Sequence, residues 1–273
     1  MSYTLYRPES TEEAIRLQKE TNGKYLAGGT VSLVNYHKRR DIGEVQISLD
    51  RIPELTQIYR ENGVLCIGSM VTMDMLEVSA DVKTYARALW QAASEVGGPQ
   101  IRNRATLGGN LAAASPSSDC ATPLLALNAE LCVQGEKGMR FIPLRDFFLG
   151  RMQHVLTPDE IIVSVRIPER TQAASAFRKV GKRNALAVSC INMAVIRCGA
   201  QIDIAVGAAA PKPVYCGKTS GLLSQKEPDL TVALQMIQTE ISPIDDRWAT
   251  ATYRRTVCGN LLKALLQETE ELL

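Results

Sequence analysis

The sequence contains few of the residues that build metal centres or disulfide frameworks. It has only two histidines, and its seven cysteines stand at positions 66, 120, 132, 190, 198, 216 and 258. The cysteine number is odd, the spacings are wide and no C-x-x-C motif occurs, so neither a disulfide framework nor a zinc or iron–sulfur site is expected in this chain. Reduced, mostly buried thiols are typical of a cytosolic protein, so the expected location is cytoplasmic.

The sequence also lacks long apolar runs and an excess of charge of one sign. No stretch of about 18 apolar residues occurs, so no membrane-spanning helix is expected. The polar start MSYTLYRPES lacks the apolar core of a secretory signal. The net charge is +2, which favours neither nucleic acid nor an anionic membrane as a partner. The basic cluster at 37–40 is expected to be solvated at the end of a helix.

Alternating strand-like and helix-like patterns predict an α+β protein in two layers, with a small parallel element at the start. Ser10 and Glu13 form a capping box before an apolar stripe, and Gly199-Ala200 is a typical hairpin turn. Helices are predicted at 11–20, 31–38, 86–96, from Pro123, and at 230–241 and 246–270. Strands are predicted at 24–27, 44–49, 64–68, 130–134, 139–142, 160–167, 176–180, 186–198 and 201–209. A domain boundary is expected within 168–174, where the sequence turns polar.

Two glycine pairs, in LAGGT at 26–30 and TLGGN at 106–110, share the same local composition. Each pair is expected in a loop that offers consecutive backbone N–H groups, with glycine at positive φ and no Cβ in the way. One turn of this kind can hold a phosphate, and two brought together can hold a pyrophosphate. Neither pair matches G-x-G-x-x-G or the P-loop. For either pair alone, a tight turn or close packing is the favoured interpretation.

The segment QIRNRATLGGNLAAASPSSD, residues 100–119, is rich in small side chains, which suggests that something large lies against its backbone. It resembles the second flavin-binding segment of the FAD-binding (medium) subunits of molybdenum hydroxylases, and KYLAGGT resembles their first. The likeness continues into DEIIVSVRIP at 159–168, AFRKVGKRN at 176–184 and GAAAPKPVYC at 207–216, and thus spans nearly the whole chain. Within this family the xanthine dehydrogenase branch is the most similar.

The resemblance implies an FAD site made of both segments, with no catalytic acid or base in this chain. From the first segment it implies contacts by Lys24, Tyr25, Leu26, Ala27, Gly28, Gly29, Thr30 and Val31. From the second it implies Thr106, Leu107, Gly108, Gly109, Asn110, Ser115 and Asp119. Relatives often have an acidic residue where Val31 stands, so one contact to the adenosine end is expected to be missing.

Three further positions follow from the same resemblance. Asp119 would accept hydrogen bonds from the ribityl hydroxyls or the flavin ring, although it could instead be the N-cap of a helix at 120–128. Ile162 would pack on the isoalloxazine, although it could also be a core strand residue. Arg178 or Lys179 would be a basic residue near the flavin, and the local alignment leaves open which of the two it is.

The resemblance also implies a fold and a division of labour. The expected fold is an FAD-binding domain over residues 1–170, with subdomains at about 1–55 and 56–170, followed by a C-terminal α+β domain over 171–273. A molybdenum cofactor and [2Fe–2S] clusters would lie on partner subunits, and the FAD of this chain would reduce NAD. The NAD acceptor rests on the resemblance alone, because the sequence has no separate nicotinamide fingerprint.

Two other functions remain open from the sequence. The chain could be a structural subunit that has kept the fold and lost the flavin, although the intact glycine pairs argue against that. It could also be a stand-alone FAD oxidoreductase, which would need its own substrate base or nucleophile. No histidine or cysteine stands in either glycine motif to serve that role.

Overall fold

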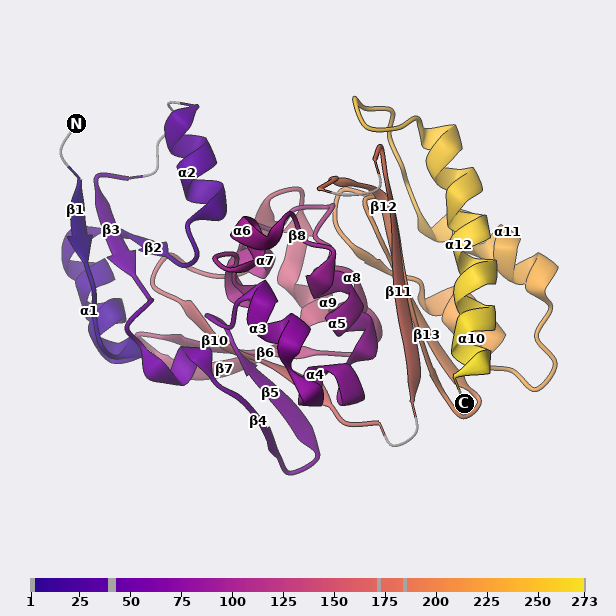
Figure 1. Cartoon of the computed structure of the whole chain (residues 1–273), viewed down its shortest axis with the longest axis horizontal. Coiled ribbons are helices and arrows are strands. Elements are labelled where there is room, and N and C mark those ends of the chain that lie inside the picture. The colour runs from indigo at the N-terminus through magenta and orange to yellow at the C-terminus, as the bar shows by residue number, and fades with distance from the viewer. Residues whose placement is uncertain (1–2, 39–42, 171–172, 184–185, 273) are drawn as a thin grey trace.

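The computed structural model describes residues 3–38, 43–170, 173–183 and 186–272. The chain is α+β and forms three bodies in a row, each built on its own sheet (Figure 1). The N-terminal body lies at one end, the central body carries most of the short helices, and the C-terminal body is covered by a long helix. No helix within the described ranges is both long and apolar enough to cross a membrane.

The N-terminal body is the small parallel element that the sequence predicts. Its sheet has the order β1-β3-β2, in which β1 (Thr4–Tyr6) and β2 (Lys24–Leu26) both pair in parallel with β3 (Val45–Ser48). Helix α1 (Thr11–Thr21) begins at Ser10, whose hydroxyl accepts from the Glu13 amide at 3.1 Å. Helix α2 (Thr30–His37) follows β2 directly and has no buried residue. The strand β1 was not predicted.

The central body is an antiparallel sheet covered on one face by short helices. Its strand order is β4 (Ile58–Glu61), β5 (Val64–Gly68), β10 (Ile161–Pro168), β6 (Glu130–Gly135) and β7 (Gly138–Pro143). Alternate residues such as Leu65, Ile67 and Val165 face the helices and are fully buried, which is the pattern of a sheet with one covered face. The covering helices include α3 (Met73–Val78), α4 (Ala80–Tyr85), α5 (Arg87–Ser94) and α8 (Ala121–Ala126).

Much of this covering layer was not predicted, because its helices are too short to show a helical period. The unpredicted elements of the central body are β4, α3, α4, the 3-10 turn η1 (Pro53–Thr56), α6 (Pro99–Arg102), α7 (Leu107–Ala112), α9 (Leu144–Phe147), β8 (Phe148–Gly150) and β9 (Gln153–His154). The residues 100–119 therefore form short helices and turns, not one extended loop.

The C-terminal body is the predicted antiparallel set. Its order is β11 (Ala174–Gly181), β12 (Ser189–Cys198), β13 (Gln201–Gly207) and β14 (Val214–Tyr215), and Gly199 makes the hairpin turn with a φ of 57°. Helices α10 (Gly217–Leu223), α11 (Leu230–Glu240) and α12 (Ala251–Glu271) pack on it. The predicted strand at 186–198 starts too early, since Leu186 has a φ of 53° and β12 begins at Ser189. The last helix begins at Ala251, after Thr250 caps it, and not at 246.

Polar contacts join the central and C-terminal bodies. The Asp203 side chain on β13 is 3% exposed. It accepts from Arg170 Nη1, which follows β10, at 2.6 Å and pairs with Arg145 of α9 at 3.8 Å. Helices α5 and α8 pack against β11, β12 and β13. The interface is therefore continuous with the core, which fixes the C-terminal body beside the site described below.

Candidate functional site

A cavity of about 590 Å³ lies where the three bodies meet. Its lining residues come from six parts of the chain, which are residues 25–32, Leu49, the turn 69–70, residues 96–119, residues 156–162, and residues 186–188. The sequence-predicted residues that line it are Tyr25, Ala27, Gly28, Gly29, Thr30, Val31, Thr106, Gly108, Gly109, Asn110, Ser115, Asp119 and Ile162. Both glycine segments thus meet at one cavity, as the sequence predicts.

The first glycine segment presents unengaged backbone N–H groups. Gly29 precedes α2 with a φ of 77°, a conformation that suits glycine. Leu33 N donates to Gly29 O at 2.9 Å, which starts the helix. Within the described part of the chain, no hydrogen bond uses the amides of residues 28–32. These amides lie at the N-terminus of α2, where the helix dipole adds partial positive charge, so the segment is suited to an anion.

The second glycine segment does not present such groups, and here the prediction is wrong. Leu107 N donates to Val71 O at 2.9 Å, Gly108 N donates to Ser69 O at 2.8 Å, and Gly109 N donates to the Thr106 hydroxyl at 3.2 Å. Gly109 lies inside α7 and has no positive φ. The segment TLGGN therefore forms a wall of the cavity without serving as an anion nest.

In each pair the first glycine, Gly28 or Gly108, is required by packing within the protein. A Cβ on Gly28 would lie 1.7 Å from the Arg104 carbonyl oxygen, and one on Gly108 would lie 2.6 Å from Ser69 Cβ. A Cβ on Gly29, in contrast, would meet nothing nearer than Leu26 Cδ1 at 3.8 Å. The close-packing interpretation is thus correct for Gly28 and Gly108, and it does not apply to Gly29.

Three predicted residues lie beside the cavity and not in its lining. Leu107 is fully buried in the central core. Lys24 and Leu26 belong to β2, which carries the first segment into position by pairing with β3. Their contribution is to place the segment, since they do not face the cavity.

Ile162 is a core strand residue that also lines the cavity. It is 5% exposed, belongs to the central core, and lines the cavity. A register shift in the pairing of β10 with β6 falls between Ile162 and Ser164. Such irregularities re-aim side chains near sites.

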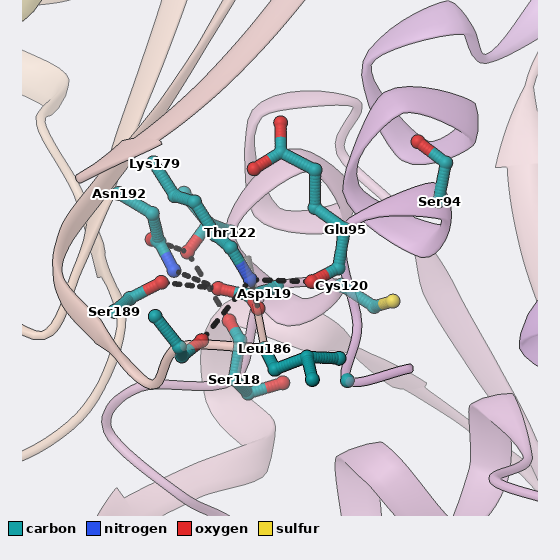
Figure 2. A network of polar contacts seen from close by, with 12 residues as sticks. Ser94, Glu95, Ser118, Asp119, Cys120, Thr122, Lys179, Leu186, Ser189 and Asn192 are labelled. Carbon is teal, nitrogen blue, oxygen red and sulfur yellow. Dashed lines mark hydrogen bonds and ion pairs between the residues drawn. The ribbon is translucent and has the colours of Figure 1, made fainter. Parts of the chain in front are cut away.

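Asp119 lines the cavity, but its carboxylate is already engaged. Its Oδ1 accepts from the Ser189 hydroxyl at 2.5 Å and from Asn192 Nδ2 at 2.8 Å, and its Oδ2 accepts from Lys179 Nζ at 2.9 Å (Figure 2). The N-cap interpretation is wrong, because α8 has no side-chain cap at Cys120 and the Ser118 hydroxyl accepts from the Ala121 amide. Asp119 instead joins the central body to β12.

The two basic candidates on β11 point to opposite sides, as neighbours on a strand do. Lys179 faces Asp119 and its side chain is only 9% exposed. Arg178 is 53% exposed and pairs with Glu268 on α12 at 2.8 Å, away from the cavity. Of the two, only Lys179 lies near the cavity lining, and it does so behind Asp119.

The remaining ionisable side chains of the lining are also engaged. The Tyr25 hydroxyl donates to Asp159 O at 3.0 Å, and burial raises the pKa of Tyr25. Glu160 accepts from Arg140 Nε at 2.6 Å, a contact that lowers the pKa of Glu160. Among the described lining residues, Tyr25, Glu160 and Asp119 are the ionisable ones. The cavity is thus built to hold and orient a molecule, and the described lining offers no unpaired acid or base.

Sequence reasoning missed lining residues outside the two motifs. Ala112 and Ala113 belong to the segment 100–119, which is rich in small side chains. Ser69 and Met70 come from a turn after β5. Leu186, Ala187 and Val188 precede β12. The other missed residues are Ser32, Leu49, Val96, Gly97, Ile101, Ala105, Ser117, Ser118, Leu156, Glu160 and Ile161. Most are single apolar or small residues, which no motif distinguishes from core positions.

Residues 1–170 match the family described as FAD binding domain in molybdopterin dehydrogenase, and residues 175–269 match the CO dehydrogenase flavoprotein C-terminal domain. The chain belongs to this family of FAD-binding subunits of molybdenum hydroxylases. It is 30% identical over 277 aligned positions to the xanthine dehydrogenase FAD-binding subunit of Escherichia coli O157:H7, covering 96% of this chain and 94% of that one. It is 29% identical to the carbon monoxide dehydrogenase medium chain of Hydrogenophaga pseudoflava, covering 97% and 96%.

Solved structures agree with this membership. The chain aligns with a carbon monoxide dehydrogenase structure from Hydrogenophaga pseudoflava with a TM-score of 0.94 at 27% identity, covering 100% of this chain and 98% of that one. Quinoline 2-oxidoreductase from Pseudomonas putida 86 aligns with a TM-score of 0.91 at 22% identity over 99% and 98% of the two chains, which shows the shared fold. The chain is therefore an FAD-binding oxidoreductase subunit of a molybdenum hydroxylase.

The cavity fits the flavin dinucleotide that this family binds. The unengaged amides of residues 28–32 are suited to its diphosphate. The small side chains of Gly109, Ala112 and Ala113 leave room along α7, and Ile162 offers an aliphatic surface. The first motif therefore offers donors for an anion, and the second offers a wall of small side chains.

Proposed function

We propose that this chain is the electron-transfer subunit of a xanthine dehydrogenase-like enzyme, in which its FAD takes electrons from a partner chain and delivers them to NAD. The row of unengaged amides at residues 28–32, opening on the same cavity as α7, carries the proposal. FAD, when bound, supplies the redox chemistry, and the protein supplies position and electrostatics. The two other subunits would carry [2Fe–2S] clusters and a molybdenum cofactor.

The roles proposed for the lining follow from its geometry. Gly29, Thr30 and Val31 would bind the diphosphate through their backbone N–H groups, and the Thr30 hydroxyl would add a further bond. The Thr106–Ala113 wall would lie along the ribityl chain, and Ile162 would pack against the flavin ring. We also assign the FAD-binding domain to residues 1–170 and the C-terminal domain to 171–273, in line with the matched ranges.

The proposed substrate follows from the relatives and from the resemblance of the sequence. Relatives of similar identity are named for xanthine, for nicotinate and for carbon monoxide. We propose a purine or a related N-heterocycle, because the sequence most resembles the xanthine dehydrogenase branch and the two relatives named for xanthine are 30% identical over 96% of this chain. The substrate would be oxidised on the molybdenum subunit, so this chain sets the acceptor and not the substrate. A cytoplasmic location would fit NAD as that acceptor.

The test is reconstitution with the partner subunits. The isolated chain loaded with FAD should oxidise NADH with an artificial dye and should leave xanthine and hypoxanthine unchanged. Adding the iron–sulfur and molybdenum subunits should give NADH formation that depends on one of these substrates. Substrate-dependent turnover by the chain alone would refute the proposal and favour a stand-alone flavoenzyme, and a reconstituted complex that contains no flavin would favour a structural subunit.

A further inference from the structure

Lys179 has no ammonium proton left for a bound flavin. Its Nζ donates to Asp119 Oδ2 at 2.9 Å, to the Glu95 carbonyl at 2.5 Å and to the Ala187 carbonyl at 3.3 Å. An ammonium group has three donors, and all three are used. Three separate segments thus meet at one cation, as Figure 2 shows for Glu95, Asp119 and Lys179. These segments are the end of α5, the turn before α8, and the residues before β12.

The acceptor side of this cluster is equally complete. Asp119 also receives the Ser189 hydroxyl and Asn192 Nδ2, and Asn192 Oδ1 in turn accepts from the Thr122 hydroxyl at 2.7 Å. Asn192 and Ser189 are 0% and 1% exposed. A buried ion pair needs such satisfied partners, because each unpaired buried charge is costly. The cluster is therefore organised before any ligand arrives.

The segments that Lys179 joins are the ones that border the cavity. Ala187 and Leu186 line the flavin cavity and also a second cavity of about 680 Å³, and Gly97, two residues after Glu95, lines both as well. The wall between the two cavities is thus made of the chain just before β12 and just after α5. Lys179 holds both parts by their carbonyl groups.

We propose that Lys179 is a positioning residue, which fastens the Glu95 and Ala187 carbonyls to Asp119 and so sets the wall shared by the two cavities. Lys179 acts on FAD through this wall and not as a direct ligand. This proposal rests on the proposed function in one respect, which is that FAD occupies the cavity of about 590 Å³. It departs from the expectation that a basic residue at this position contacts the flavin.

The test compares Lys179→Met with Arg178→Met in the full chain without FAD and then with FAD. Methionine keeps the length of lysine and removes all three hydrogen bonds, whereas Arg178→Met removes the neighbouring cation, which faces α12. Deuterium uptake of the peptide covering residues 186–193 in the apoprotein should be at least about tenfold faster in Lys179→Met, the ratio expected for one lost charge-assisted bond. FAD affinity should fall by a similar factor, and Arg178→Met should match the wild type in both.

The affinity for FAD, measured well below the unfolding transition, is the readout that a purely structural role would leave unchanged. Weaker FAD binding with unchanged exchange in the apoprotein would make Lys179 a direct ligand and overturn the proposal. Faster exchange with unchanged FAD affinity would overturn it too. If Lys179→Met does not fold, Ser189→Ala, which loosens Asp119 from β12, should show the same paired effects at smaller size, and their absence would refute the proposal. A wild-type chain that takes up no FAD would instead refute the proposed function, and Arg178→Met would then take up none either.

Discussion

The two glycine pairs look alike in sequence and do different work in the structure. In LAGGT the amides of residues 28–32 are left for a ligand, whereas in TLGGN the amides of residues 107–109 are all bonded within the protein. In each pair the first glycine is forced by close packing, against the Arg104 carbonyl or against Ser69. A Gly-Gly pair therefore indicates that another part of the backbone packs closely against it. Whether its amides can bind a ligand depends on whether they already donate hydrogen bonds within the protein.

The largest expected effect is on the packing glycine of the first pair. Gly28→Ala places a Cβ 1.7 Å from the Arg104 carbonyl oxygen, so we expect a loss of about 3 kcal/mol or more in the free energy of unfolding. Gly108→Ala should cost less, because its nearest neighbour is Ser69 Cβ at 2.6 Å. Urea unfolding of the apoprotein measures both. Equal stability of Gly28→Ala and the wild type would contradict the packing assignment.

The next effect is on the glycine that faces the cavity in the first pair. Gly29→Val puts a side chain into the space proposed for the diphosphate and should weaken FAD binding about hundredfold, as an overlap of ~3 kcal/mol would. It also places a branched residue at a φ of 77°. Gly199→Val is the matched control, since Gly199 has a φ of 57° and open space around it. The control should lose stability and keep FAD affinity, and a loss of FAD in both variants would show that backbone strain alone is responsible.

A smaller effect is expected at the corresponding glycine of the second pair. Gly109→Val narrows the wall along α7 and should weaken FAD binding about tenfold. The reason is steric, because Gly109 is helical and lines the cavity, where its Cβ would lie 3.5 Å from Ala27 Cβ of the first segment. The same Cβ would lie 2.9 Å from the Thr106 hydroxyl oxygen. Gly221→Val, at a helical glycine with nothing within 4 Å, is the control. Full FAD affinity in Gly109→Val would remove the second segment from the binding wall.

The smallest expected effect is on the pH dependence of stability and of FAD retention, and it separates an ion pair at the cavity from one remote from it. The Arg140 contact lowers the pKa of Glu160 below its usual value of 4.5. This contribution to stability is therefore present above pH 4.5 and is lost as the pH falls through the lower folded pKa. Glu160→Gln should flatten the pH dependence of unfolding in that range and also that of FAD retention. Glu169→Gln removes a similar pair with Arg60, remote from the cavity, and should affect unfolding only. Identical FAD retention curves for the two variants would contradict this account.

The sequence was sufficient to predict the helices and strands that have a clear hydrophobic period. It was also sufficient to predict that the two glycine motifs lie at one site. The strands β5, β6, β10 and β13 and the helices α1, α5 and α11 were predicted close to their positions. Apart from α8, for which a helix from Pro123 was predicted, the helices of four to six residues in the central body were missed, because so few residues do not display an amphipathic period. The start of β12 was placed too early, since the apolar residues Leu186 and Val188 line the cavity and do not enter the sheet.

The sequence predicted which glycine segments line the cavity, because their motifs indicate the backbone conformation. It did not predict the hydrogen-bond partners of the groups in those segments. No sequence pattern shows that the Leu107, Gly108 and Gly109 amides donate to the Val71 carbonyl, the Ser69 carbonyl and the Thr106 hydroxyl. Nor does it show that Asp119 is committed to Lys179, Ser189 and Asn192, which lie 60 to 73 positions away. Such contacts arise from the packing of the C-terminal body on the central one, and only the folded chain brings them together.

The most direct test of the account is equilibrium binding of FAD to the purified apoprotein, followed by quenching of the flavin fluorescence. We expect equimolar uptake of FAD, a flavin absorption band in the isolated protein, and release of FAD and not FMN on denaturation. Phosphate or pyrophosphate should compete for the same site, because the amides of residues 28–32 bind the diphosphate. A folded protein that stays colourless and takes up no FAD would contradict the central claim.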